Sequence, residues 1–255
     1  MIFDTHVHYD DDAFSQDRED LLAEFPSYGI CGAVDVAASA DSIDKVLDLA
    51  ARHDFLYCAL GIHPSECGDM TPELLSEIEG KLTRPKVVAV GEIGLDYHWD
   101  EPDRELQQYW LRRQIEMAHR AGLPIIIHSR DAAKDTFDIL TEMDGARNGC
   151  VMHCYSYSAE MAVEYTKLGY FLGVGGVVTF KNARRLKEAV QAVPIESIVL
   201  ETDCPYLAPV PHRGERNCSL YLPYVVDEIA RLKEITPQEV IDITYGNAKR
   251  LYRLE

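Results

Sequence analysis

Short apolar runs alternate along the chain with stretches in which apolar residues recur at helical spacing. Runs such as Val87-Val88-Ala89-Val90 are continuously apolar, which is typical of parallel strands buried on both faces. Between them, stretches such as residues 41–53 keep apolar side chains three or four positions apart, as in an amphipathic helix. The pattern therefore predicts a regular succession of strands and helices.

We predict eight strand and helix units, the last followed by a long loop and two further helices. The predicted strands are residues 1–8, 32–37, 55–60, 87–90, 123–127, 150–152, 170–174 and 197–200. The predicted helices are residues 15–28, 41–53, 104–120, 132–143, 159–168, 182–193, 220–233 and 237–251, with one more that opens at Thr71-Pro72-Glu73.

Eight such units favour an α/β fold, a closed TIM-type (β/α)8 barrel with extra C-terminal helices. In such a barrel the functional groups lie at the C-terminal ends of the strands. An open, doubly wound sheet is the alternative. No linker, repeat or low-complexity segment divides the chain, so we expect residues 1–255 to form a single domain.

The composition limits the partners of the protein. With 43 acidic and 25 basic residues the formal net charge is −18, which disfavours nonspecific adhesion to nucleic acid or anionic membranes. A phosphate substrate would therefore need local cations or metal ions. No targeting segment or run of about 20 apolar residues is evident, and seven cysteines without a Cys-x-x-Cys pair indicate reduced thiols. We expect a cytoplasmic protein without membrane attachment or an obligate protein partner.

Potential metal ligands recur at the predicted ends of the strands. His6 and His8 close the first strand and, being two residues apart, point to the same side of it. The complete set is His6, His8, Glu92, His128, His153 and Asp203. Each one alone has an ordinary explanation, such as a hydrogen bond or a helix cap. A barrel brings its strand ends to one face, so their recurrence indicates a shared site.

Four imidazoles and two carboxylates exceed what one tetrahedral zinc needs and suit two divalent ions roughly 3.5 to 4 Å apart. We expect Glu92 to bridge the ions, because it has two oxygens and lies between the two histidine sets in the chain. His6, His8 and Asp203 would then hold one ion. His128 and His153 would hold the other. Asp203 is also the candidate that holds the attacking water and takes its proton. Such ligands accept Mg²⁺, Mn²⁺ or Zn²⁺.

Further polar groups are candidates for binding substrate phosphate. They are His63, Arg130 and, in the loop after the last strand, Arg213, which we favour over Arg216. Arg130 has the alternative of an ion pair with Asp131 or Asp135. Glu201 lies two residues before Asp203, so it shares a face with Asp203 but lies one layer deeper in the barrel. A role in supporting the ligands is there as plausible as a direct role in the site. The aromatic run Tyr97-His98-Trp99 suits either base stacking or packing.

The sequence resembles the TatD family of metal-dependent deoxyribonucleases, a branch of the amidohydrolase-like barrels. The motifs that carry the resemblance are Phe3-Asp4-Thr5-His6-Val7-His8, Gly61-Ile62-His63-Pro64, Gly91-Glu92-Ile93-Gly94-Leu95-Asp96-Tyr97, Pro124-Ile125-Ile126-Ile127-His128-Ser129-Arg130-Asp131-Ala132, His153-Cys154-Tyr155-Ser156 and Glu201-Thr202-Asp203-Cys204-Pro205-Tyr206-Leu207-Ala208-Pro209. The resemblance implies a TIM-type barrel, two divalent ions and hydrolysis of DNA phosphodiesters, often from a 3′ end on single strands. It also implies ligand roles for the six residues named above.

Two departures from the family pattern bear on substrate preference. Glu215, Arg216 and Asn217-Cys218-Ser219 stand where such proteins tend to have a basic residue and then Asn-Glu-Pro. Tyr157 replaces a usual small residue after His153. Both changes flank the predicted mouth of the barrel.

Other functions fit the same ligand set. The alternatives are hydrolysis of another ester or amide, by a D-aminoacyl-tRNA deacylase or a small-molecule amidohydrolase, and a noncatalytic metal-binding role. Many amidohydrolases bridge their metals with a modified lysine from strand four. This chain has Glu92 there and Lys86 only at the start of that strand, which favours the phosphodiesterase branch. The intact ligand set argues against a noncatalytic role.

Overall fold

The computed structural model describes residues 1–99 and 101–254. Within these residues eight strands form one sheet, in which they are neighbours in the order of the chain. The strands are β1 (Ile2–Val7), β2 (Ile30–Val36), β3 (Leu56–Leu60), β4 (Val87–Asp96), β5 (Ile125–Arg130), β6 (Cys150–Met152), β7 (Phe171–Val174) and β8 (Ile198–Leu200). The pairing is parallel, as between β4 and β5 and between β7 and β8.

The first and last strands also lie side by side. The Thr5 hydroxyl donates a hydrogen bond to the Leu200 carbonyl at 2.9 Å, and Val7 forms a parallel bridge with Cys204. The sheet therefore closes, and the fold is the TIM-type (β/α)8 barrel that the sequence predicts.

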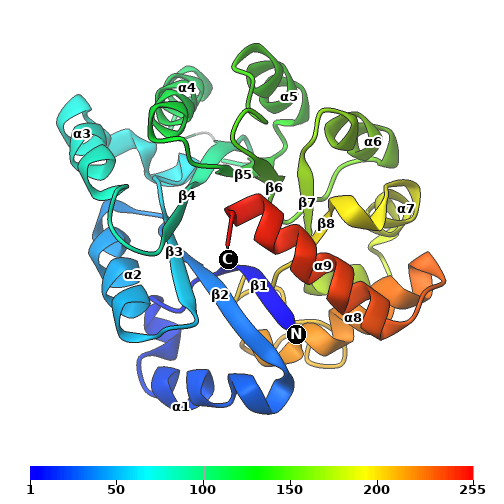
Figure 1. Ribbon diagram of the computed structural model, residues 1–255. Coiled ribbons are helices and arrows are strands. Elements are labelled where there is room, and N and C mark those ends of the chain that lie inside the picture. The colour runs from blue at the N-terminus through cyan, green and yellow to red at the C-terminus, as the bar shows by residue number, and fades with distance from the viewer. Residues whose placement is uncertain (100, 255) are drawn as a thin grey trace. The chain divides into compact units, whose positions relative to one another are not determined.

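Helices α1 to α7 connect successive strands, α8 follows β8, and α9 is additional (Figure 1). Their bounds are α1 (Arg18–Ala23), α2 (Ala40–Arg52), α3 (Pro72–Lys81), α4 (Arg104–Ala121), α5 (Ala133–Glu142), α6 (Ala159–Lys167), α7 (Arg184–Ala192), α8 (Leu222–Lys233) and α9 (Pro237–Tyr252). Short 3-10 helices are η1 (Asp12–Phe14), η2 (Phe25–Tyr28), η3 (Pro64–Asp69), η4 (Gly176–Thr179), η5 (Ile195–Ser197) and η6 (Ser219–Tyr221).

Local sequence signals set the helix ends. At the start of α3 the Thr71 side chain accepts the Leu74 N–H, and Pro72 stands in the first turn. Helix α9 begins with a capping box between Thr236 and Glu239. The predicted helix of residues 15–28 is wrong, because it is divided into α1 and η2. Pro26 lacks an N–H and fits only the first turn of a new helix.

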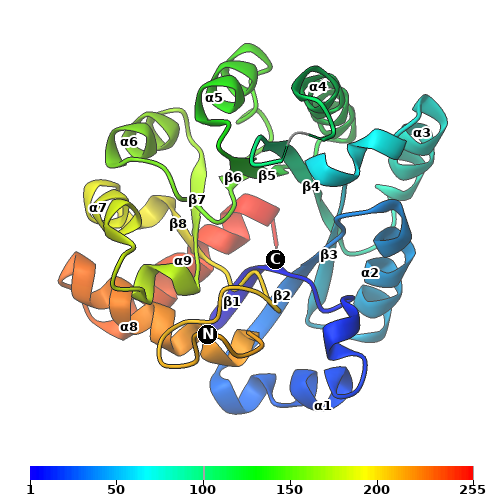
Figure 2. The same ribbon diagram turned by 180° about the vertical axis from the view of Figure 1, so that it is seen from behind.

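The chain forms two compact units. The first comprises residues 1–35 and 154–255. In it, α7, α8 and α9 lie side by side (Figure 1), and α9 packs against β1 and β8. The buried Tyr252 of α9 donates its hydroxyl to the Thr5 carbonyl at 2.8 Å. Seen from behind, the loop that follows β8 lies beside α8 (Figure 2).

The second unit comprises residues 36–153, with β3 to β6 and helices α2 to α5. All ten residues of β4 are buried. Gly94 allows β4 to approach β5, since a Cβ atom there would lie 1.9 Å from the His128 carbonyl oxygen. Its φ of +157° is one that residues with side chains rarely adopt.

Strands β4 and β5 are longer than the sequence predicts. Parallel pairing continues from Ile93 with Ile127 to Asp96 with Arg130. The predicted strand ends at residues 90 and 127, with Glu92 and His128 closing the strands, are therefore wrong. Both lie inside them, because backbone pairing persists where the apolar pattern has already stopped.

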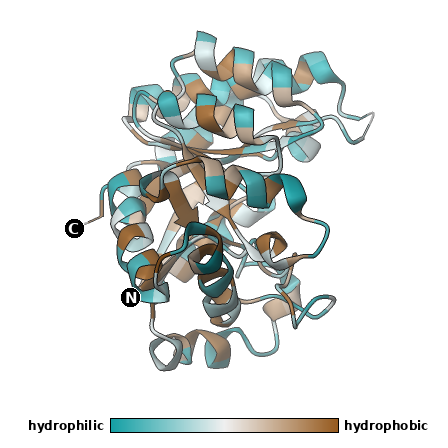
Figure 3. Cartoon of the chain, turned by 90° about the vertical axis from the view of Figure 1, so that its right-hand side faces the viewer, coloured by the Kyte–Doolittle hydropathy of each residue, from teal (hydrophilic) through white to brown (hydrophobic). Residues whose placement is uncertain are grey.

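The apolar side chains concentrate on the strands, which are mostly brown in the hydropathy view, whereas the helices alternate brown and teal (Figure 3). This distribution matches strands buried on both faces and amphipathic helices. None of the helices in the described part of the chain is both long enough and apolar enough to cross a bilayer.

Candidate metal centre

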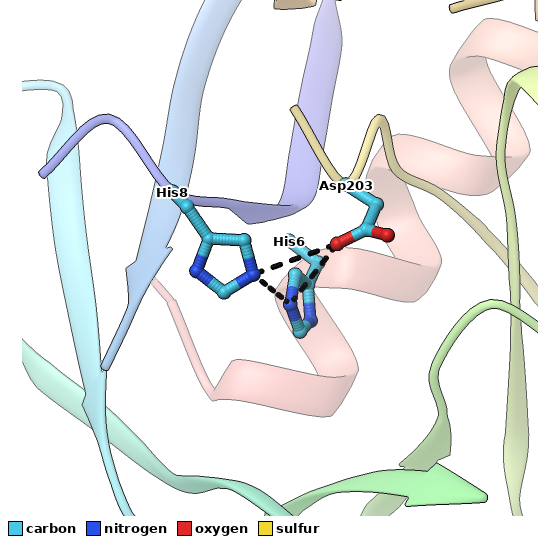
Figure 4. Close-up of side chains that lie close together, drawn as sticks. All are labelled: His6, His8 and Asp203. Atoms are coloured by element: carbon cyan, nitrogen blue, oxygen red, sulfur yellow. Dashed lines mark hydrogen bonds and ion pairs between the residues drawn. The ribbon is translucent and has the colours of Figure 1, made fainter. Parts of the chain in front are cut away.

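The first group of candidate ligands lies in the first unit and consists of His6, His8 and Asp203 (Figure 4). The two imidazole Nε2 atoms lie 3.1 Å apart. Asp203 Oδ1 lies 3.5 Å from His8 Nε2 and 3.9 Å from His6 Nε2. Ligand atoms about 2.1 Å from one ion lie about 3.0 to 3.4 Å from each other in tetrahedral or octahedral geometry. The distance between the two imidazole nitrogens falls within this range, whereas Asp203 Oδ1, at 3.5 and 3.9 Å from them, lies slightly outside it. A small movement of the carboxylate would complete a donor set for one divalent ion.

Backbone hydrogen bonds hold this group together. The Asp203 N–H donates to the His6 carbonyl at 3.0 Å, and the His8 N–H donates to the Cys204 carbonyl at 2.9 Å. Asp203 has a φ of +57°, a left-handed conformation that turns the chain just after β8. The end of β1 thus fixes the loop that carries the carboxylate.

A buried hydrogen-bond network centred on Asp4 supports this first group of ligands. Asp4 Oδ2 accepts bonds from the Thr202 and Ser219 hydroxyls, both at 2.7 Å, and its Oδ1 accepts the Thr202 N–H at 3.0 Å. The Tyr9 hydroxyl donates to Ser219 Oγ at 2.9 Å. Burial raises the pKa of Asp4 to about 7, although these hydrogen bonds oppose the shift.

Asp35 is a second buried carboxyl group near these ligands. Its Oδ1 accepts the Tyr9 N–H at 2.8 Å, whereas its Oδ2 has no hydrogen-bond partner among the described residues. Burial and the charge of Asp10 raise the pKa of Asp35 to about 8, and His8 opposes the shift. A buried unpartnered carboxyl oxygen is costly unless positive charge is near. An ion held by His6 and His8 would supply that charge.

The second group lies in the second unit and is centred on Glu92 Oε1. His128 Nδ1 lies 2.8 Å from this oxygen, His153 Nε2 3.8 Å and His63 Nε2 4.0 Å. The side chains of Glu92 and His153 are almost fully buried. Three imidazole nitrogens around one carboxylate oxygen again form a donor set suited to a divalent ion.

Main-chain hydrogen bonds also fix this second group. The Glu92 N–H donates to the Ala37 carbonyl at 2.9 Å, and the His63 N–H donates to the neighbouring Ala38 carbonyl at 2.9 Å. The His153 N–H donates to the Ile127 carbonyl at 2.9 Å, at the end of β6. Ligands from three separate segments are thus anchored through their own backbone.

Asp96 holds the other side of the His128 ring. Asp96 Oδ2 lies 3.1 Å from His128 Nε2, and the amide of the buried Gln107 makes hydrogen bonds to both the N–H and the C=O of Asp96. Burial acts to lower the pKa of His128, but hydrogen bonds to Asp96 and Glu92 outweigh it and raise the pKa to about 9. With His128 as a metal ligand, Asp96 would hold and orient its ring.

Three carboxylates of the site, Asp4, Asp35 and Asp96, were not predicted from the sequence as functional residues. Asp96 lies four positions after Glu92, so the even spacing of a strand places both on one face. The even spacing of Glu92 and Asp96 would have indicated a shared face only if the predicted strand had extended beyond Val90. The structure also places His63, predicted as a phosphate contact, within 4.0 Å of Glu92.

Glu201 is almost fully buried in the first unit. Its Oε1 accepts the Cys154 N–H at 2.7 Å. Gly173 makes room for it, since a Cβ atom there would lie 2.1 Å from Glu201 Oε2. The carboxylate thus ties the start of the segment after β6 to the end of β8.

The candidate cations differ in the ion pairs and ring contacts that they already make. Arg216 binds Asp17 through a hydrogen bond of 2.8 Å and lies over the Phe14 ring. Arg213 is exposed, with its guanidinium 4.5 Å from the centre of the Phe180 ring. Arg130 is exposed as well, and neither Arg213 nor Arg130 forms an ion pair among the described residues.

The sequence model of the family described as TatD related DNase matches residues 3–253. The chain belongs to this family. It is 42% identical over 254 residues to YabD of Bacillus subtilis, called an uncharacterized metal-dependent hydrolase, and the match covers 100% of both chains. It is 32% identical to YcfH of Escherichia coli K12, which has the same description, over 100% of this chain and 97% of that protein.

A solved structure of the TatD family confirms the barrel fold. The crystal structure of YjjV, a TatD homologue from Escherichia coli, superposes with a TM-score of 0.94 at 33% identity. The match covers 100% of this chain and 98% of that chain. This protein is therefore a metal-dependent hydrolase of the TatD family, and each of its two units holds a group of His and carboxylate side chains suited to a divalent ion.

Proposed function

We propose that this TatD-family hydrolase is a divalent-metal-dependent deoxyribonuclease that acts on single-stranded DNA from the 3′ end. The observation that carries the proposal is a group of potential metal donors within each unit. His6, His8 and Asp203 form the first, and His63, Glu92 and His128 form the second, with His153 Nε2 3.8 Å from Glu92 Oε1. The family description as TatD related DNase supports DNA as the substrate. We further propose that residues 1–255 act as one domain.

We assign three protein ligands to each of the two proposed ions. One ion is held by His6, His8 and Asp203. His128, His153 and Glu92 hold the other, and a bridging role of Glu92 stays a prediction from the sequence. When bound, two divalent ions lower the pKa of a water and neutralise charge on phosphoryl oxygens.

Asp203 is the candidate proton acceptor for the attacking water. Its side chain is 17% exposed, against 1% for His6 and 11% for His8. Water can therefore reach the carboxylate more readily than either imidazole of the same group. We propose that Asp203 orients the water through one oxygen and takes its proton.

Cationic side chains would hold the substrate. The exposed Arg213 is available to pair with a phosphate in bidentate fashion, whereas Arg216 is already bound to Asp17. Arg130 and His63 remain weaker candidates for the same task. All seven cysteines are free thiols, which is consistent with the proposed cytoplasmic location.

The test uses metal-stripped protein, resupplied with Mg²⁺, Mn²⁺ or Zn²⁺, and single-stranded DNA labelled at either end. DNA labelled at its 3′ end should release the label at once as a mononucleotide. DNA labelled at its 5′ end should give labelled products that become shorter by one nucleotide at a time. Glu92→Gln, which keeps the size of the side chain, should remove both reactions and serves as the control for contaminating nucleases. Absence of cleavage with every metal would contradict the proposal and favour D-aminoacyl-tRNA or a small amide as substrate.

A further inference from the structure

Exposed apolar side chains gather just after the candidate ligand Asp203. Tyr206 is 55% exposed, Leu207 39% and Val210 45%. Most large apolar side chains of the described residues are buried, so three exposed ones within five positions form a distinct feature. We call Tyr206, Leu207 and Val210 the apolar loop.

The backbone of the apolar loop is firmly anchored. The buried Asn217 side chain donates to the carbonyls of Thr202 and Tyr206, at 2.8 and 2.7 Å. The Val210 N–H donates to Thr179 Oγ1 at 2.8 Å. These bonds use backbone atoms of the loop and leave its side chains available for a ligand.

The loop also carries local backbone strain. Leu207 has a φ of +56°, a left-handed conformation that residues with side chains rarely adopt. Its carbonyl packs against Gly176, where a Cβ atom would lie only 2.2 Å away. The turn that contains this residue leaves the Leu207 side chain 39% exposed.

Tyr206 connects the loop to the metal ligand. Its N–H donates to the Asp203 carbonyl at 2.9 Å, and its hydroxyl donates to Asp11 Oδ2 at 3.3 Å. Only the edge of the ring is tethered, so more than half of the side chain stays open to a partner. A ring fixed in this way loses little entropy on stacking.

The charged residues around the loop favour an uncharged base at one position and a phosphate at another. The acidic side chain of Asp11 contacts the Tyr206 hydroxyl and would repel a phosphate there. Farther along the loop, Arg213 is exposed, stacks on Phe180 and has no ion pair among the described residues. An uncharged flat group therefore suits Tyr206, and a phosphate suits Arg213.

We propose that the apolar loop is a platform for a nucleobase of single-stranded nucleic acid, with Arg213 binding a neighbouring backbone phosphate. The base stacks on Tyr206 and packs against Leu207 and Val210. Because these contacts are apolar, the platform accepts any of the four bases. This inference rests on the proposed nuclease function and names how its substrate is held.

The test compares a normal single-stranded oligonucleotide with one whose 3′-terminal residues are abasic. Stacking is worth about 1 to 3 kcal/mol per base, so Tyr206→Ala should lower kcat/KM on the normal oligonucleotide about fivefold to a hundredfold. The same variant should leave the abasic oligonucleotide unchanged. Tyr206→Phe keeps the ring and should behave like the wild type on both.

Tyr28→Ala is the matched control, since Tyr28 is 48% exposed but precedes the start of β2, at the opposite end of the strands from Asp203. It should change neither rate. Equal losses on both oligonucleotides in Tyr206→Ala, or no loss on either, would overturn the platform. The melting temperature of each variant shows whether the fold is intact.

A failure of the nuclease proposal would be recognised separately. If the wild type cleaves neither oligonucleotide, that proposal fails, and the platform is judged by fluorescence anisotropy of labelled normal and abasic oligonucleotides. Weaker binding of the normal oligonucleotide by Tyr206→Ala than by the wild type would support the platform. Equal binding by the two proteins, or equal binding of normal and abasic DNA by the wild type, would overturn it.

Discussion

Asp96 Oδ2 lies 3.1 Å from His128 Nε2, on the side of the ring away from Glu92. This contact leaves Nδ1 as the nitrogen that faces Glu92. A carboxylate behind a ligating histidine fixes the tautomer and direction of the ring, and loss of such a partner typically costs tenfold to a hundredfold in metal affinity.

Asp96→Asn should therefore weaken binding of one metal ion by about tenfold to a hundredfold, while binding of the other ion is unchanged. Calorimetric titration of the metal-stripped protein with Mn²⁺ would separate the two events. Asp131→Asn is the control, because Asp131 lies 3.3 Å from His98 and is exposed. If both variants bind Mn²⁺ like the wild type, Asp96 does not position His128.

Loss of the buried Asp4 carboxylate should destabilise the protein. Asp4→Ala leaves the buried hydroxyls of Thr202 and Ser219 without their acceptor, which we expect to cost about 2 to 4 kcal/mol. The variant should also bind metal more weakly, because Asp4 supports the segments of His6 and Asp203. Urea unfolding with and without Mn²⁺ measures both effects, and an unchanged unfolding midpoint would show that the network contributes little.

Two glycines with opposite surroundings test the close approach of β4 and β5. Gly94→Ala should prevent normal folding, because its Cβ atom would meet the His128 carbonyl and its φ is +157°. Gly80→Ala in α3 meets no atom within 4 Å and should be neutral or stabilising by about 0.5 to 1 kcal/mol. Thermal unfolding of both variants gives the comparison. A Gly94→Ala protein as stable as the wild type would contradict the observed strand spacing.

An ion-pair cluster on α8 should make stability depend on pH. Hydrogen bonds from Arg231, and then from Lys187, lower the pKa of Glu228 from 4.5 to about 2. The Glu228 side chain is 17% exposed, so after solvent screening we expect about 1 to 2 kcal/mol from the ionised form. Because the folded-state pKa is lowered, this contribution is complete above about pH 5 and is lost as the pH falls towards 2.

Glu228→Gln tests this dependence. The difference in unfolding free energy between wild type and variant should be constant above pH 5 and should shrink towards zero near pH 2. Glu188→Gln removes an exposed partner of Arg184 and should change little at any pH. A Glu228→Gln difference that does not vary with pH would show that the carboxylate is not stabilised by its charge.

The sequence predicted the order of elements well because their apolar patterns differ. Apolar residues are continuous in buried parallel strands and recur three or four positions apart in amphipathic helices. It predicted strand ends less well, since Glu92 and His128 continue strands by backbone pairing that no apolar residue reveals. The six candidate ligands were predicted from the rule that barrel strands carry chemistry at their C-terminal ends, and their ligand roles stay a prediction.

Other features of the site were not visible in the sequence. Asp35 lies 27 positions from His8 in the chain, and only the fold shows that its buried carboxyl group lies near that ligand. Asn217 anchors the exposed Tyr206 through a hydrogen bond across eleven positions of the chain. Such relationships arise from packing and have no periodic signature.

The most direct test of the central claim is a titration of metal-stripped protein with Mn²⁺ in the presence of 5′-labelled single-stranded DNA. The account predicts that cleavage appears with Mn²⁺ and reaches its plateau at two equivalents per chain. His8→Ala and His128→Ala, which each remove a ligand from a different group, should both abolish it. Cleavage that persists in chelator, or no cleavage at any Mn²⁺ concentration, would contradict the account.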